Sequence, residues 1–132
     1  MIVLDTHALI WWVNGDARLS AAAAAAIKGA AGNEGQILVS AITAWEVAML
    51  VERGRIALAM DLDQWLRTVE SMEGVFMVPI TSQVAAQSAT LPGVFHKDPA
   101  DRMIVALARE LNAPVVTADD KIQRYPHVRW VW

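Results

Sequence analysis

Two carboxylates stand just behind apolar, β-branched runs of the sequence. Asp5 directly follows the run at residues 2–4, and Asp119 lies two residues after the run at residues 115–117. Such runs predict buried strands of a parallel sheet, which would bring both acids to the carboxyl edge where α/β proteins bind their ligands. A lone aspartate after a strand is more often the N-cap of the next helix, so neither position indicates a site by itself.

Three further acids, Glu46, Asp98 and Asp101, have helical spacing that points to a site. Apolar residues lie one or two helical turns from each of the two acids Glu46 and Asp101. They are Ile42, Met49 and Leu50 around Glu46, and Ile104, Val105 and Ala108 after Asp101. Glu46 and Asp101 therefore belong to helix faces that should turn toward the core, and Asp98 shares the first helical turn with Asp101. A buried, unpaired carboxylate needs a cation, a hydrogen-bond network or a raised pKa. An arginine from elsewhere could pair with Glu46, and Arg102 could neutralise part of the charge of Asp101.

Five acids gathered at one edge would repel one another unless a polyvalent cation lay between them. Oxygen ligands favour Mg²⁺ or Mn²⁺, and the chain has no cysteine and only three histidines to favour zinc. One or two such ions, about 3.5–4 Å apart when paired, can activate water and stabilise a phosphoryl displacement. Thr6 and Thr117 flank two of the acids, where a hydroxyl can bond a carboxylate or a water, although a turn or strand role is equally common. A glycosidase pair of carboxylates would not require so many acids.

The elements that must position these acids alternate along the sequence. Short apolar runs predict strands at residues 2–4, 37–39, 75–78 and 115–117, with residues 128–132 a candidate fifth strand at the edge. Helices are expected at residues 7–13, 41–53 and 82–90. Three more should begin at a capping residue: one from Ser20 to a loop at residues 29–35, one from Asp61 or Asp63 to about Met72, and one from Asp98 to about Leu111. This alternation predicts a three-layer α/β/α fold with a central parallel sheet of four to five strands, in one domain over residues 1–132.

The composition narrows the class of protein. The 132 residues are 55% hydrophobic, and the absence of cysteine excludes a disulfide scaffold, a cysteine zinc site and thiol catalysis. The net charge of −3 disfavours a basic nucleic-acid-binding module, but two bound divalent ions would bring it to about +1. The first residues lack the basic region of a secretion signal, and no uncharged stretch has the composition of a membrane-spanning helix. We therefore expect a cytoplasmic protein without membrane contact.

Six tryptophans are many for a chain of this length. Trp45 and Trp65 lie in helical patterns and are expected in the core. Trp11 and Trp12 are adjacent and cannot both face inward from a helix, so one should reach the surface and be available to a partner or to a second copy of the chain.

Four segments resemble the PIN-domain ribonucleases, and within them the VapC-type toxins of bacterial toxin–antitoxin pairs. The segments are Ile2-Val3-Leu4-Asp5-Thr6-His7, Ser40-Ala41-Ile42-Thr43-Ala44-Trp45-Glu46, His96-Lys97-Asp98-Pro99-Ala100-Asp101-Arg102 with Ile104 and Ala106, and Val116-Thr117-Ala118-Asp119. Each segment alone is degenerate, but all four in this order and at this spacing are specific, and they cover essentially the whole chain.

The resemblance implies a PIN-like fold and a metal-dependent endoribonuclease. In that family the acids matching Asp5, Glu46, Asp101 and Asp119 surround an Mg²⁺ or Mn²⁺ site, and the acid matching Asp98 often joins them. On this basis Asp5 and Asp101 are direct ligands, and Glu46 and Asp119 hold the metal or its waters.

The resemblance also implies partners. Members of the family are usually dimeric, and a cognate VapB-type antitoxin blocks their activity on RNA. Arg102 and Lys97 are candidates for contacting a substrate phosphate, although each could equally be a solvated surface charge.

Two alternatives belong to other classes of protein. A catalytically weak or inactive PIN-like module would keep the acids as a metal-stabilised scaffold and serve mainly to bind a protein partner. A response-regulator-type domain would need a phosphate-accepting aspartate after a middle strand. Here residues 37–39 are followed by Ser40 and residues 75–78 by Pro79, so this alternative is set aside.

Overall fold

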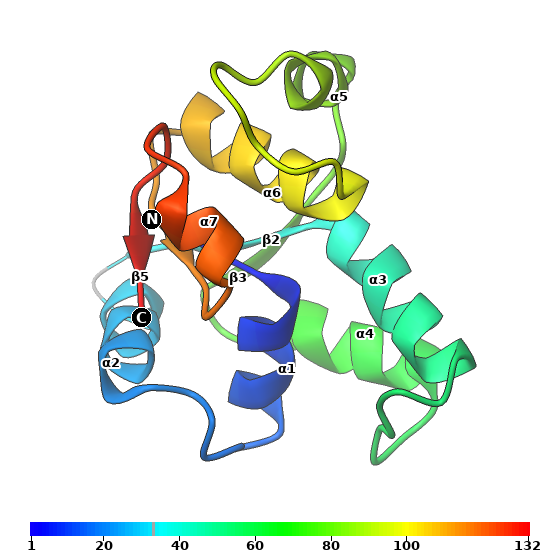
Figure 1. The fold of residues 1–132 in the computed structure, drawn as a ribbon. Coiled ribbons are helices and arrows are strands. Elements are labelled where there is room, and N and C mark those ends of the chain that lie inside the picture. The colour runs from blue at the N-terminus through cyan, green and yellow to red at the C-terminus, as the bar shows by residue number, and fades with distance from the viewer. Residues whose placement is uncertain (33) are drawn as a thin grey trace.

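Five short strands form a parallel sheet (Figure 1) in the computed structural model, which describes residues 1–32 and 34–132. The strands are β1 (Ile2–Leu4), β2 (Ile37–Ser40), β3 (Val75–Val78), β4 (Val115–Val116) and β5 (Trp130–Val131). Their order is β3-β2-β1-β4-β5, and every neighbouring pair is parallel. The carboxyl end of the central strand β1 therefore lies between those of β2 and β4.

Successive side chains of the strands face two separate hydrophobic layers, because a strand alternates its side chains between the faces of the sheet. In β1, Ile2 and Leu4 pack into one buried cluster, whereas Val3 packs into the other. β2 follows the same pattern, with Leu38 on the side of Val3. Burial on both faces explains why these strands are continuous apolar runs.

Helices cover both faces of the sheet. They are α1 (Thr6–Val13), α2 (Ala21–Ala31), α3 (Ala41–Glu52), α4 (Leu62–Ser71), α5 (Ser82–Ala89), α6 (Pro99–Glu110) and α7 (Asp120–Arg124). The first buried cluster contains residues of α1, α2 and α4, together with Val47 of α3, and the second contains residues of α5, α6 and α7. Figure 1 shows α5 and α6 on one side of the sheet and α1, α2 and α4 on the other. The predicted three-layer α/β/α fold is confirmed.

The predicted elements are present, with ends that differ by a few residues, and the candidate fifth strand is confirmed as β5 at the edge. α2 continues past Gly29 to Ala31, and residue 33 of the predicted loop lies outside the described residues. The sequence did not indicate α7, because its five residues are too few to show an apolar period. In the part of the chain that the structure describes, no helix combines the length and apolar character needed to cross a bilayer.

The burial of the tryptophans differs in part from the expectation. Trp65 is buried as predicted, but Trp45 is 53% exposed, so its placement in the core was wrong. The buried residues of α3 are Thr43 and Val47, each two positions from Trp45. Two residues of a helix turn the side chain by about 200°, which places Trp45 on the opposite side from both. Trp11 and Trp12 are both partly buried, so each keeps part of its surface exposed.

Candidate metal centre

Asp5 lies at the carboxyl end of the central strand, where it also caps helix α1. Its Oδ1 accepts a hydrogen bond from the backbone N–H of Thr6 at 2.8 Å, and its Oδ2 accepts one from the hydroxyl of Thr117 at 2.7 Å. The side chain is buried. Burial raises the pKa of Asp5, and the two hydrogen bonds oppose that rise because they favour the charged form. Asp5 is therefore fixed in orientation but costly to ionise.

Glu46 reaches the same edge from the middle of α3. The hydroxyl of Thr6 donates a hydrogen bond to Glu46 Oε1 at 2.5 Å, and the hydroxyls of Thr6 and Thr43 lie 3.1 Å apart. Burial raises the pKa of Glu46 to about 7, the bond from Thr6 opposes the rise, and the negative charges of Asp5, Asp98 and Asp119 add to it. Without a cation, Glu46 therefore holds a proton far more readily than an ordinary glutamate does.

Asp101 stands in the first turn of α6, on the helix face that carries the buried Ile104 and Val105. Burial raises the pKa of Asp101 to about 8, and the charges of the neighbouring acids add to this effect. His96 Nε2 lies 3.0 Å from Asp101 Oδ2.

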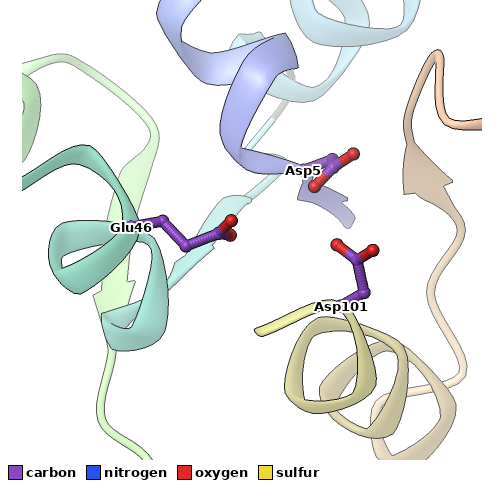
Figure 2. Close-up of side chains that lie close together, drawn as sticks. All are labelled: Asp5, Glu46 and Asp101. Atoms are coloured by element: carbon purple, nitrogen blue, oxygen red, sulfur yellow. The ribbon is translucent and has the colours of Figure 1, made fainter. Parts of the chain in front are cut away.

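The three carboxylates of Asp5, Glu46 and Asp101 converge on one point (Figure 2), and each offers an oxygen within 4.8 Å of the others. Asp5 directly follows β1, Glu46 lies in α3 and Asp101 in α6, so the three come from segments far apart in the sequence. Three partly or fully buried carboxylates with raised pKa values are an arrangement that a divalent cation would stabilise. Oxygen donors of this kind fit a hard ion such as Mg²⁺ or Mn²⁺.

Asp98 and Asp119 lie around this trio as helix caps. Asp98 Oδ1 accepts from the backbone N–H of Asp101 at 3.0 Å at the start of α6. Asp119 Oδ1 accepts from the N–H groups of Lys121 and Ile122 at the start of α7. Both are close enough for their charges to raise the pKa values of Glu46 and Asp101. The structure thus gathers all five acids at one edge and brings three of them into direct proximity.

The threonines that flank the acids orient them. Thr6 bonds Glu46, and Thr117 bonds Asp5 while its oxygen accepts the backbone N–H of Asp119 at 2.9 Å. Each hydroxyl therefore connects two segments that carry acids of the site.

The two candidate phosphate-binding residues have different surroundings. The guanidinium of Arg102 donates to the backbone carbonyls of Ser88, Phe95 and His96, at 2.7, 3.0 and 3.2 Å. These bonds hold the loop before α6, so Arg102 has a structural role whatever else it contacts. Lys97 is exposed beside a cavity of about 460 Å³.

The sequence interpretation did not single out two residues of this site. The spacing of Thr43, one helical turn before Glu46, marks it as a neighbour of that carboxylate, but its contact with the hydroxyl of Thr6 was not predicted. His96 lies in the irregular segment before α6, where no periodicity predicts its contact with Asp101.

Two cavities open beside the carboxylates. One, of about 270 Å³, is lined by Asp5, His7, Trp11, Ala118 and Asp119. The other, of about 210 Å³, includes Glu46 and Asp98 in its wall. The acids are therefore accessible to a ligand from two sides.

A comparison with known protein families identifies the architecture. Residues 2–128 match the family described as the PIN domain. The chain belongs to the PIN-domain family. The ribonuclease VapC22 of Mycobacterium tuberculosis is 40% identical to this PIN domain over 128 residues, which are 97% of this chain and 94% of the relative. The resemblance seen in the four sequence segments is confirmed.

Solved structures show the same fold at lower identity. A VapBC2 complex from Rickettsia felis, bound to a promoter DNA fragment, superposes with a TM-score of 0.71 at 19% identity, covering 98% of this chain and 97% of the other. A toxin–antitoxin complex from Klebsiella pneumoniae gives a TM-score of 0.66 at 20% identity, with 97% and 95% covered. These likenesses support the PIN fold of this chain.

Proposed function

We propose that this PIN domain is a metal-dependent endoribonuclease and the toxin of a VapBC-type toxin–antitoxin pair. The observation that carries the proposal is the convergence of Asp5, Glu46 and Asp101, whose carboxylate oxygens lie within 4.8 Å of one another. The 40% identity to a ribonuclease of the VapC type supports the substrate class, because the relative covers nearly the whole chain.

The residues of this chain have distinct roles in the proposed reaction. Asp5 and Asp101 would hold the metal directly, and Glu46 and Asp119, joined by Asp98, would hold the metal or its waters. When bound, Mg²⁺ or Mn²⁺, as one or two ions, supplies the Lewis acidity that activates water and stabilises the charge developing on the phosphodiester.

The threonines keep these carboxylates in place. Thr117 fixes Asp5 and Thr6 fixes Glu46 through the hydrogen bonds described above. Preorganised ligands lose less freedom when the ion and substrate bind. Lys97, which is exposed and precedes Asp98 in the sequence, is our candidate for contacting a substrate phosphate, whereas the bonds of Arg102 favour a role in shaping the loop.

The proposal includes the partners and the compartment. A VapB-type antitoxin would block the site, as the complexes formed by the structural neighbours suggest. We further propose that the chain acts as a homodimer of one domain each, in the cytoplasm where its RNA substrate is found.

Cleavage of RNA by the purified full-length chain tests this function. Cleavage should require Mg²⁺ or Mn²⁺ and stop when EDTA is added. Asp5→Asn and Asp101→Asn should abolish it while the circular dichroism spectrum stays unchanged, and Asp63→Asn, at an exposed position on α4, should cut like the wild type. If the metal-loaded wild type cuts no RNA and its expression arrests no growth, the function is wrong and the inactive-module alternative gains support.

A further inference from the structure

A groove beside the metal centre carries an exposed tryptophan. Trp45 is 53% exposed and lines the cavity of about 210 Å³ between α3 and the start of α6. Its neighbour in the sequence, Glu46, lines the same cavity and belongs to the carboxylate trio. A half-exposed indole gains little from the core of its own chain, so its exposed face is available to a ligand that reaches the carboxylates.

The far end of this groove is basic. Arg53 caps the end of α3 and Arg55 follows it closely, and both line the cavity and are exposed. Neither arginine forms an ion pair with any residue in the ranges 1–32 and 34–132. Trp45, Met49 and Arg53 are four residues apart and share one helix face, so the indole and the guanidinium lie along a common line.

We propose that this groove binds one nucleotide of a single-stranded RNA substrate, with its base stacked on Trp45 and a flanking phosphate bound by Arg53 and Arg55. The inference rests on the proposed ribonuclease function, because it assigns the strand next to the bond that is cut. An aromatic face beside unpaired cations is the usual combination in proteins that hold single strands.

The geometry favours a nucleotide over a protein segment. The cavity is smaller than the roughly 300–1,000 Å³ of sites for drug-sized ligands, which suits a single base better than a folded helix. Glu46 lines both this groove and the metal centre, so a strand whose phosphodiester lies at the carboxylates is within reach of Trp45. Asp98 also lines the groove, and its charge acts on Glu46, so a cation bound at the carboxylates would offset it.

Binding of RNA in the absence of cleavage tests the groove. A fluorescently labelled 12-nucleotide RNA pool of random sequence is titrated with the full-length chain in Ca²⁺, and anisotropy is followed at several salt concentrations. Trp45→Ala should weaken binding roughly 5- to 150-fold, the range measured for loss of one base–aromatic stack. It should leave the salt dependence unchanged. Trp45→Phe should retain most of the affinity.

The arginines should have a different signature. Arg55→Gln should lower the slope of log affinity against log salt by about 0.7, the value expected for one lost phosphate contact on a single strand. Trp130→Ala, at a 44% exposed tryptophan on β5, and Arg67→Gln, at an exposed arginine on α4, are the matched controls and should match the wild type. In cleavage assays with Mg²⁺, Trp45→Ala should raise KM and leave kcat nearly unchanged.

The outcomes separate this inference from the proposed function. If the wild type cuts RNA and Trp45→Ala and Arg55→Gln bind RNA like the two controls, the groove is not a substrate site, whatever else it binds. If the wild type binds RNA through Trp45 but never cuts, the groove stands and the ribonuclease function fails. Failure of the wild type to bind any RNA in the pool would overturn both.

Discussion

Replacing Asp101 with asparagine should stabilise the metal-free protein at neutral pH. The asparagine side chain has the shape of the carboxyl group but cannot ionise, so the variant loses the repulsion from the neighbouring acids. The pKa of Asp101 rises from 3.8 to about 8 on folding. A carboxyl group with a raised pKa binds more protons in the folded state than in the unfolded state, so the free energy of unfolding falls as pH increases between these two values.

The magnitude follows from the same shift. One pKa unit corresponds to about 1.4 kcal/mol, so the cost of Asp101 approaches about 4 kcal/mol at pH 7. Burial accounts for the largest part of this cost, and the charges of the neighbouring acids, which can themselves bind protons, add the rest. We therefore expect Asp101→Asn to gain about 2–4 kcal/mol, which corresponds to roughly 8–16 °C in Tm for a chain of this size.

Thermal unfolding in EDTA at pH 4, 6 and 7.5 measures the effect. The gain should be smallest at pH 4, where the carboxyl group is protonated in the folded state and still partly protonated in the unfolded state, and greatest at pH 7.5. Saturating Mg²⁺ should then raise the Tm of the wild type much more than that of the variant, because ligand binding to the folded state adds stability in proportion to affinity. Asp63→Asn, at an exposed position, should change Tm little and show no such dependence on pH.

A loss of stability in EDTA would refute the reasoning. It would mean that the contact of Asp101 with His96, at 3.0 Å, outweighs burial and the repulsion from the other acids. A gain that is equal at pH 4 and pH 7.5 would also refute it, because the effect would then not arise from ionisation.

The contacts around the carboxylates give three further expected outcomes. Thr117→Val should lower the free energy of urea unfolding by about 1–3 kcal/mol, because Asp5 and the N–H of Asp119 lose the hydroxyl, and Thr117→Ser should restore most of it. Arg102→Met should cost about 2–4 kcal/mol in the same assay, because three backbone carbonyls lose their donor, and Arg102→Lys should recover only part of this. Calorimetric titration should show that the affinity for Mg²⁺ rises between pH 6 and 8, because the cation must replace protons on Glu46 and Asp101. The rise should reach up to about tenfold per pH unit for each proton displaced. An affinity that does not change with pH would contradict the raised pKa values.

The sheet and the convergence of the acids could be predicted because both depend on local pattern. Strands buried on two faces must be apolar throughout, so residues 2–4 and 37–39 are visible as runs. Parallel strands end at the same edge, so an acid behind one strand must lie near an acid behind its neighbour. The inward orientation of Asp101 followed from its spacing to Ile104 and Val105, which are both buried.

Features that depend on contacts between distant segments could not be predicted in the same way. The helical pattern around Trp45 suggested the core, but the direction of its side chain is set by which face of α3 meets the sheet, and Val47 lies on that face. An arginine such as Arg102 can bind a phosphate, which is what the sequence suggested. In the folded chain its guanidinium instead donates to three backbone carbonyls, a contact that the sequence does not predict. His96 approaches Asp101 only because that same loop turns back over α6.

The cap and ligand roles of these aspartates are compatible rather than competing. Helices α1, α6 and α7 begin directly after Asp5, Asp98 and Asp119, and in each case the capping bond from a backbone N–H reaches Oδ1. A carboxylate accepts several hydrogen bonds or metal contacts, so Oδ1 can cap the helix while Oδ2 faces a cation. The N-termini of these helices also carry partial positive charge, which stabilises negative charge at this edge of the sheet. The parallel fold therefore favours aspartate at these positions for a local reason, and the same placement concentrates acids where a metal centre can form.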